Sequence, residues 1–122
     1  MIPKAQVMGE FVAPFSVRSR LTREEHTVRF SHLWSAIATR HSDTIDCKFL
    51  VNGRGVVVAL AHPAFGEFRE RAGRPLTDQE TAALAAAYLR EYLESDREIS
   101  GATLAVGREE VLRLAGSLGF LR

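Results

Sequence analysis

The chain has 122 residues, of which 46% are hydrophobic and 25% charged, values typical of one globular domain and unlike those of disordered, collagen-like or membrane-spanning chains. Sixteen basic against fifteen acidic residues give a net charge of +1, which excludes a strong attraction of the whole molecule to nucleic acid or anionic lipid. The single cysteine cannot form an internal disulfide, and no apolar run is long enough for a signal peptide or a membrane span. We therefore expect one soluble domain over residues 1–122, located in the cytoplasm.

The predicted elements begin with a strand and a helix. Alternating apolar and polar residues predict a strand over residues 10–18, and Pro14 restricts it to an edge of the sheet or to a bulge. Residues 22–25 have the Thr-x-x-Glu spacing of a capping box. Apolar residues and histidines then recur at spacings of three and four from His26 to His41, which predicts a long helix.

A rival interpretation of the same segment begins from its β-branched residues. Thr27 and Val28 favour extended backbone, so residues 26–30 would form a short strand, and a shorter helix would run from Ser31 to about Arg40. We take the longer helix as the prediction and keep the short strand as the alternative.

The strongest local signal is a hairpin that turns at Asn52-Gly53, between strands at 45–51 and 54–61. With Val51 opposite Arg54, the deeper pairs on that face are all apolar: Phe49 with Val56, Cys47 with Val58 and Ile45 with Leu60. The other face of the second strand is made of small and apolar residues, so this strand should lie further inside the sheet than the first.

The remaining elements follow from turn and capping signals. Helices are predicted from Pro63 until Gly73, from the capping box at Thr77 to about Ser95, and from Arg108 to about Leu118, with a short strand over 102–106. The candidate neighbours of the second hairpin strand are residues 102–106 and residues 10–18.

These elements define an α+β fold. We expect a small antiparallel or mixed sheet, built on the hairpin at 45–61, with about four helices packed on it. No internal repeat and no linker divides the chain.

Cys47 is the only thiol of the chain and the most obvious candidate nucleophile. The predicted register places it on the same strand face as Ile45, Phe49 and Val51. We therefore expect an inert, buried thiol that behaves as a small hydrophobic residue.

Ionisable groups from separate segments are predicted to converge at the open end of the hairpin, where position 43 lies opposite His62. His41, Asp43 and His62 would form a corner suited to acid–base chemistry. With Arg18 and Arg20 from the first strand, the corner would instead hold a small anionic ligand. A simpler interpretation is a structural histidine that complements the dipole of a helix end.

No motif implies a cofactor or a metal ion. His32 and His41 would face opposite sides of the predicted helix, and His26 would lie about 22 Å from His41 along it. Neither histidine pair could share one ion.

The predicted function is a non-catalytic binding or assembly module that acts on a protein partner or forms a homodimer. Tyr88 and Tyr92 are candidate contacts for a partner, although core packing explains them more simply. The alternative is a small enzyme or anionic-ligand binder that uses the corner described above. A second alternative is weak nucleic-acid binding through the cluster from Arg18 to Arg29, which is disfavoured because the aromatic residues are predicted on apolar faces.

Overall fold

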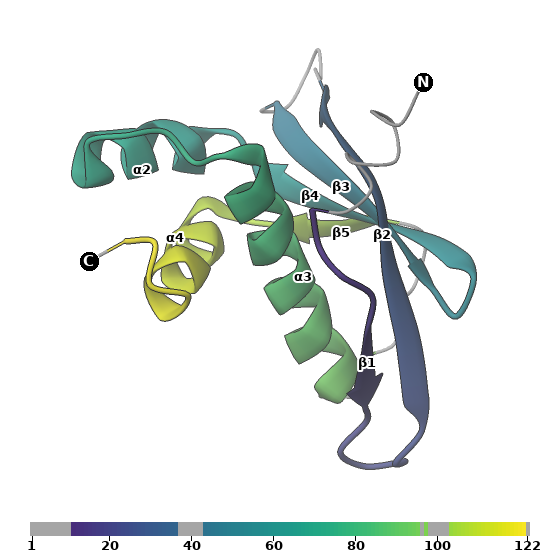
Figure 1. Cartoon of the computed structure of the whole chain (residues 1–122). Coiled ribbons are helices and arrows are strands. Elements are labelled where there is room, and N and C mark those ends of the chain that lie inside the picture. The colour runs from purple at the N-terminus through teal and green to yellow at the C-terminus, as the bar shows by residue number, and fades with distance from the viewer. Residues whose placement is uncertain (1–10, 37–42, 96, 98–102, 122) are drawn as a thin grey trace.

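The chain forms a five-stranded sheet with helices packed on it (Figure 1). The computed structural model describes residues 11–36, 43–95, 97 and 103–121. The elements are β1 (Phe15–Arg18), β2 (Glu25–Ala36), β3 (Thr44–Val51), β4 (Arg54–Ala61), α2 (Pro63–Ala72), α3 (Asp78–Glu94), β5 (Thr103–Val106) and α4 (Arg108–Ser117). The predicted α+β class is confirmed, with three helices in the described part of the chain instead of about four.

The strand order is β1-β2-β3-β4-β5, so consecutive strands are neighbours throughout the sheet. The first four strands pair antiparallel, whereas β5 runs parallel to β4 and makes the sheet mixed. β5 therefore lies beside the second hairpin strand, as predicted. The predicted strand at 10–18 is confirmed only for residues 15–18, which form β1, and β1 pairs with β2 at the opposite edge of the sheet. Residues 11–14 are not in a strand, and residue 10 lies outside the described residues. Pro14 directly precedes this edge strand, where its missing N–H disturbs no ladder.

The hairpin of β3 and β4 has the predicted register, with Phe49 opposite Val56 and Cys47 opposite Val58. Its turn residues Asn52 and Gly53 have φ angles of 53° and 83°, as a two-residue turn between twisted strands requires. The Asn52 side chain also accepts a hydrogen bond from the Thr27 N–H at 2.9 Å. The turn is thereby attached to the neighbouring strand β2.

β2 corrects the sequence-based prediction. The long helix from His26 is wrong, because residues 25–36 form a strand. The alternative is confirmed for its short strand at 26–30, but its helix from Ser31 is contradicted as far as residue 36. The remainder of both predicted helices, at 37–41, lies outside the described residues.

A β-bulge explains why β2 resembled a helix. Phe30 lies opposite Phe49 and His32 lies opposite Lys48, so Ser31 is an extra residue without a partner on β3. The bulge leaves both Phe30 and Leu33 packed on the core side of the sheet. Two core residues three positions apart are also what a helix produces.

The segment expected to cap that helix forms a tight turn between β1 and β2. The Thr22 hydroxyl accepts the Glu24 N–H at 3.2 Å, and the Thr22 N–H donates to Ser19 Oγ at 3.1 Å. Arg23 has a positive φ of 65°, which no helix interior allows. The Thr22 hydroxyl therefore stabilises a local turn with the same kind of hydrogen bond that threonine makes at a helix N-cap.

The other helices are confirmed. The Thr77 side chain accepts the Glu80 N–H, and the Glu80 carboxylate accepts the Thr77 N–H, both at 3.0 Å, which is the predicted capping box of α3. α2 ends at Gly73, whose φ of 77° is the left-handed conformation that glycine adopts without strain. Leu118, predicted to be buried by the last helix, is instead 40% exposed just after α4.

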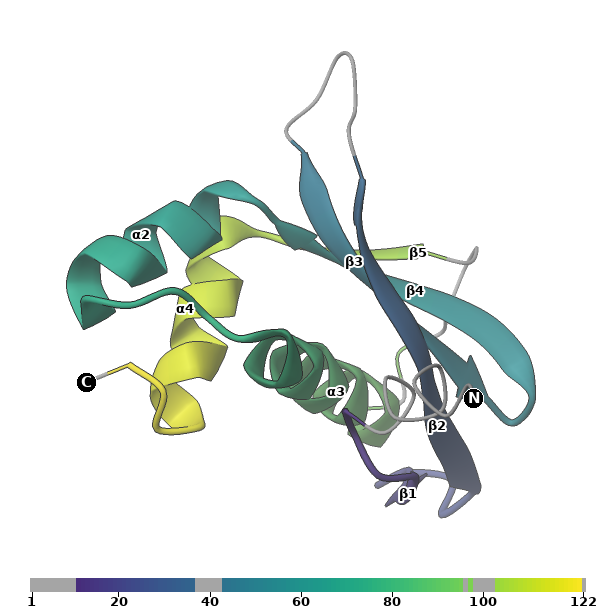
Figure 2. The same cartoon turned by 45° about the horizontal axis from the view of Figure 1, so that its top comes forward.

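α2, α3 and α4 cover the same side of the sheet (Figure 2). The core lies between this layer and the sheet, and its largest fully buried side chains are Phe49, Phe68, Leu60, Leu84, Leu89 and Leu114. No helix of the described residues is long and apolar enough to cross a membrane.

Candidate functional site

Two residues of the predicted corner meet at the open end of the hairpin. The His62 N–H donates to the Asp43 carbonyl oxygen at 3.0 Å, as expected from the register. Both residues are exposed, and the His62 ring lies beside Phe65, with ring centroids 6.2 Å apart. His41, the third member, lies outside the described residues.

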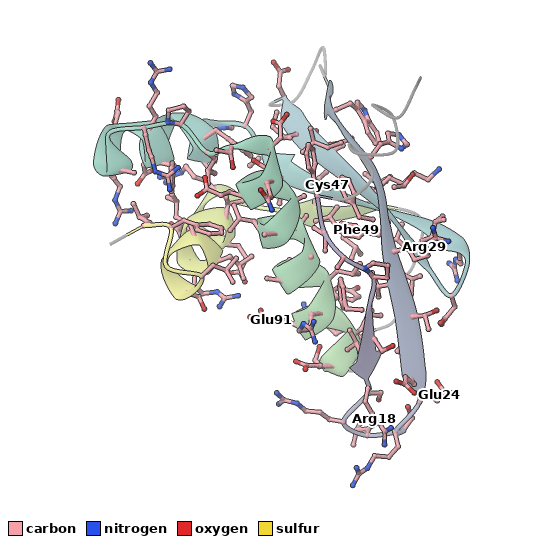
Figure 3. The ribbon with its side chains drawn as sticks, viewed as in Figure 1. Arg18, Glu24, Arg29, Cys47, Phe49 and Glu91 are labelled. Carbon is pink, nitrogen blue, oxygen red and sulfur yellow. The ribbon has the colours of Figure 1, made fainter. Side chains whose placement is uncertain are left out.

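The structure does not bring the predicted arginines to that corner. Arg18 lies opposite Glu25, at the end of β2 far from the corner (Figure 3). The Arg20 N–H donates to the Glu94 carbonyl oxygen at 3.1 Å, and its guanidinium lies 3.9 Å from the Glu94 carboxylate. Arg20 therefore connects the β1–β2 turn to the end of α3.

Cys47 is fully buried between the sheet and the helices (Figure 3). Burial raises the pKa of its thiol to about 12, and the charges of Asp46 and Asp78 add to the effect. The thiol is therefore protonated at neutral pH and is not a nucleophile, as expected from its apolar neighbours.

A pocket of about 380 Å³ lies near the ends of α2 and α4, lined by Arg71, Ala72, Arg74, Gly119 and Phe120. Its two guanidinium groups already have carboxylate partners. Arg74 donates two hydrogen bonds of 2.8 Å to the Glu80 carboxylate, while Arg71 lies 3.5 Å from Glu67. The pocket therefore offers an anion little unsatisfied charge.

The tyrosines of α3 lie against the core. Tyr88 and Tyr92 are partly buried, with ring centroids 6.1 Å apart. The Arg97 guanidinium lies 4.4 Å from the centre of the Tyr92 ring. Packing accounts for both side chains, as the simpler interpretation expected.

The sheet face opposite the helices is the better candidate, and we call it the open face. Its side chains alternate along β2, β3 and β4 with those of the core, and none belongs to the core cluster. The open face consists of Arg29, His32, Trp34, Asp46, Lys48, Leu50, Val57 and Ala59. Figure 3 shows Arg29 pointing away from α3, on the opposite side of the sheet from Cys47 and Phe49.

The Ser31 bulge places two aromatic rings on the open face. If residues 30–34 alternated regularly, with Ser31 paired in the ladder and no bulge, the alternation that buries Phe30 would also turn His32 and Trp34 toward the core. The two rings stack on each other, with centroids 4.8 Å apart and planes at 29°. The Ser31 hydroxyl lies 2.9 Å from Nδ1 of His32 and helps to orient that ring.

Lys48 lies directly across from His32 on the neighbouring strand. Its stem lies over Gly55, where an added Cβ would come within 3.0 Å of the Lys48 Cε. Asp46 lies opposite Trp34, and its carboxylate accepts the Thr44 hydroxyl at 2.6 Å. The open face is therefore cationic near Arg29 and Lys48 and acidic at Asp46, opposite Trp34.

Most arginines of the helical layer have a carboxylate or an aromatic ring beside them, with exposed Arg69 as an exception, whereas the two cations of the open face have no ion-pair partner among the described residues. Arg71, Arg74, Arg108 and Arg113 form ion pairs, and Arg90 and Arg97 lie over aromatic rings. Neither Arg29 nor Lys48 forms an ion pair with another described residue. Within the part of the chain that the structure describes, no carboxylate neutralises these two charges.

Within the described ranges, no group of three or more His, Cys, Asp and Glu side chains could hold a metal ion. No protein-family model matches the chain, and comparisons with curated proteins and with solved structures found no significant match. Only the geometry of the chain itself bears on its function.

Sequence reasoning missed the open face because it placed Trp34 and His32 on a helix. A usable signal was present in the residue types. Val28 and Phe30 alternate with polar Arg29, and Leu33 then continues the apolar face one position late. That pattern is what a strand with one extra residue produces.

Proposed function

We propose that this chain is a non-catalytic binding module and that its partner docks on the open face. The observation that carries the proposal is the stacked pair of His32 and Trp34, flanked by Arg29 and Lys48, which form no ion pair with another described residue. Aromatic and arginine side chains are enriched where proteins bind partners.

Two features support a role without catalysis. The Cys47 thiol is kept protonated by its burial, and the contact between Asp43 and His62 is made by backbone groups, which do not orient the two side chains for proton transfer. The solitary thiol also suits a reducing compartment, and we infer that the module acts in the cytoplasm.

Trp34 provides a direct test because it is the only tryptophan of the chain. The Trp34 fluorescence can be measured in titrations with three probes: a single-stranded oligonucleotide, polyglutamate as an acidic peptide, and the protein itself at rising concentration. Sedimentation velocity run on the same concentration series detects a dimer. Binding at the open face should give a saturable change in Trp34 emission with at least one probe.

Arg29→Glu and Arg69→Glu form a matched pair of variants for this test. Arg69 is an exposed arginine of α2, on the helical side of the molecule. The response should weaken at least tenfold in R29E and stay unchanged in R69E. Silence toward all three probes, or equal effects of the two variants, would overturn the open face as the binding surface.

A further inference from the structure

We propose that the occupant of the open face is a single strand of nucleic acid, with bases stacked at His32 and Trp34 and phosphates paired with Arg29 and Lys48. The inference rests on the proposed function, since it names the partner of the same surface. It departs from the sequence-based expectation, which placed Trp34 on the apolar face of a helix and disfavoured nucleic-acid binding.

The aromatic pair supplies the first part of the case. Single-stranded nucleic acids are bound on open sheet surfaces by aromatic side chains on which unpaired bases stack. The rings of His32 and Trp34 already form such a stack, with centroids 4.8 Å apart. Trp34 lies outside the core cluster, and β-bulges such as that at Ser31 occur frequently where a side chain must be redirected for function.

The charges supply the second part. Lys48 on β3 lies across from His32, and Arg29 precedes His32 on β2. The two cations, which have no ion-pair partner among the described residues, therefore lie near the His32 end of the aromatic pair. Such cations bind the phosphates of a passing strand. Asp46, across from Trp34 on the other side, would repel a phosphate, but its carboxylate can accept hydrogen bonds from the amino groups of bases.

The surface favours a single strand over a duplex and over an acidic peptide. A duplex hides its base faces, and an α-helix or β-ribbon normally enters its groove, whereas the open face presents side chains of the sheet itself. An acidic peptide would use Arg29 and Lys48 but leave the stacked rings without a matching group. Unpaired bases joined by phosphates use both features.

The experiment measures fluorescence anisotropy of a labelled oligothymidylate, the same-length duplex and labelled polyglutamate against the full chain. The single strand should bind more tightly than the duplex by at least tenfold. If Arg29 and Lys48 each neutralise one phosphate, the salt dependence should have a slope of about −1.4, so that a fourfold rise in salt weakens binding about sevenfold. Unlabelled oligonucleotide should also quench Trp34.

Variants separate stacking from charge. Trp34→Ala should weaken binding by about fivefold to 150-fold and leave the salt slope unchanged. Arg29→Ala or Lys48→Ala should each reduce the slope by about 0.7, and Arg69→Ala should change neither quantity. Far-UV circular dichroism checks folding, and quenching of Trp34 in the unaltered chain gives a readout that needs no substitution.

Each negative result has a distinct meaning. Tight binding of polyglutamate with quenching of Trp34, without binding of the single strand, would overturn the nucleic-acid proposal and retain the binding module. Nucleic-acid binding that R29A, K48A and W34A leave unchanged would also overturn it. No response to either polymer and no self-association would overturn the proposed function as well.

Discussion

Deletion of Ser31 should be tolerated, although it lies in the middle of a 12-residue strand. Phe30 and His32 are opposite consecutive residues of β3, Phe49 and Lys48. Removing Ser31 makes the ladder continuous and leaves every later side chain of β2 on its present face. The identifiable loss is the contact between the Ser31 hydroxyl and His32, worth about 0.5–1.5 kcal/mol of unfolding free energy.

Deletion of Arg29 is the matched control, because it shortens the same strand by one residue. Without Arg29, the chain keeps Val28 and Leu33 in the core only if the bulge disappears. Phe30 then turns to the open face, and Ser31 takes the core position opposite Phe49. Phe30 is 8% exposed and lies 5.5 Å from the Phe49 ring. Losing such a side chain from the core costs about 3–5 kcal/mol.

Urea unfolding followed by circular dichroism measures both free energies, and Trp34 emission reports the face on which the indole lies. The Ser31 deletion should keep the emission and acrylamide quenching of the unaltered chain. An equal loss of stability in the two deletions would refute the register of β2. A blue-shifted, poorly quenched Trp34 in the Ser31 deletion would refute it as well.

The other predictions concern the thiol, an ion pair and a turn. Cys47 should resist thiol reagents at neutral pH, because its pKa of about 12 lies above the ordinary value of 9.0. The contribution of the protonated thiol to stability is fully present below pH 9. Between pH 9 and pH 12 the unfolding free energy should fall by about 1.4 kcal/mol per pH unit, and Cys47→Ala should lack this slope. Hydrogen bonds from Arg74 lower the pKa of Glu80 to about 2 from 4.5, so this stabilisation is present above pH 4.5 and lost as the pH falls toward 2. Because the pair is near the surface, it should amount to about 1 kcal/mol, and Glu80→Gln should remove that part of the acid dependence in urea titrations. Gly73→Ala should lower the unfolding free energy by about 1 kcal/mol, because Gly73 has a φ of 77°. Gly66→Ala, inside α2 with open space around it, should raise the unfolding free energy by a similar amount. Equal melting temperatures of the two variants would contradict this difference in backbone conformation.

The elements that the sequence predicts well are those whose signals are local and have one meaning. Asn52-Gly53 allows positive φ at two successive residues, so it selects the turn, and the turn then sets the register of β3 and β4. The capping box at Thr77 and Glu80 is followed by a run of strong helix formers, and both signals favour a helix. The inert thiol followed directly from the register, because register decides which face carries Cys47.

β2 could not be predicted in the same way because its signals have two meanings. Thr22 caps a turn with the chemistry that it would use to cap a helix. The bulge at Ser31 places core residues three positions apart, which local spacing alone does not separate from a helical stripe. What decides between them is the partner strand β3, and pairing with β3 is not a property of residues 25–36 themselves.

Net charge does not describe the charge of a single face, for a related reason. A formal charge of +1 counts every arginine equally, but an arginine already bound to a carboxylate contributes little field to its surroundings. In the helical layer, Arg74 and Arg113 are each bound by neighbouring glutamates, whereas Arg29 and Lys48 have no such neighbour among the described residues. The field that a ligand meets is set by the unpaired charges of the face it approaches, so a nearly neutral chain can still present a cationic binding surface beside its stacked aromatic rings.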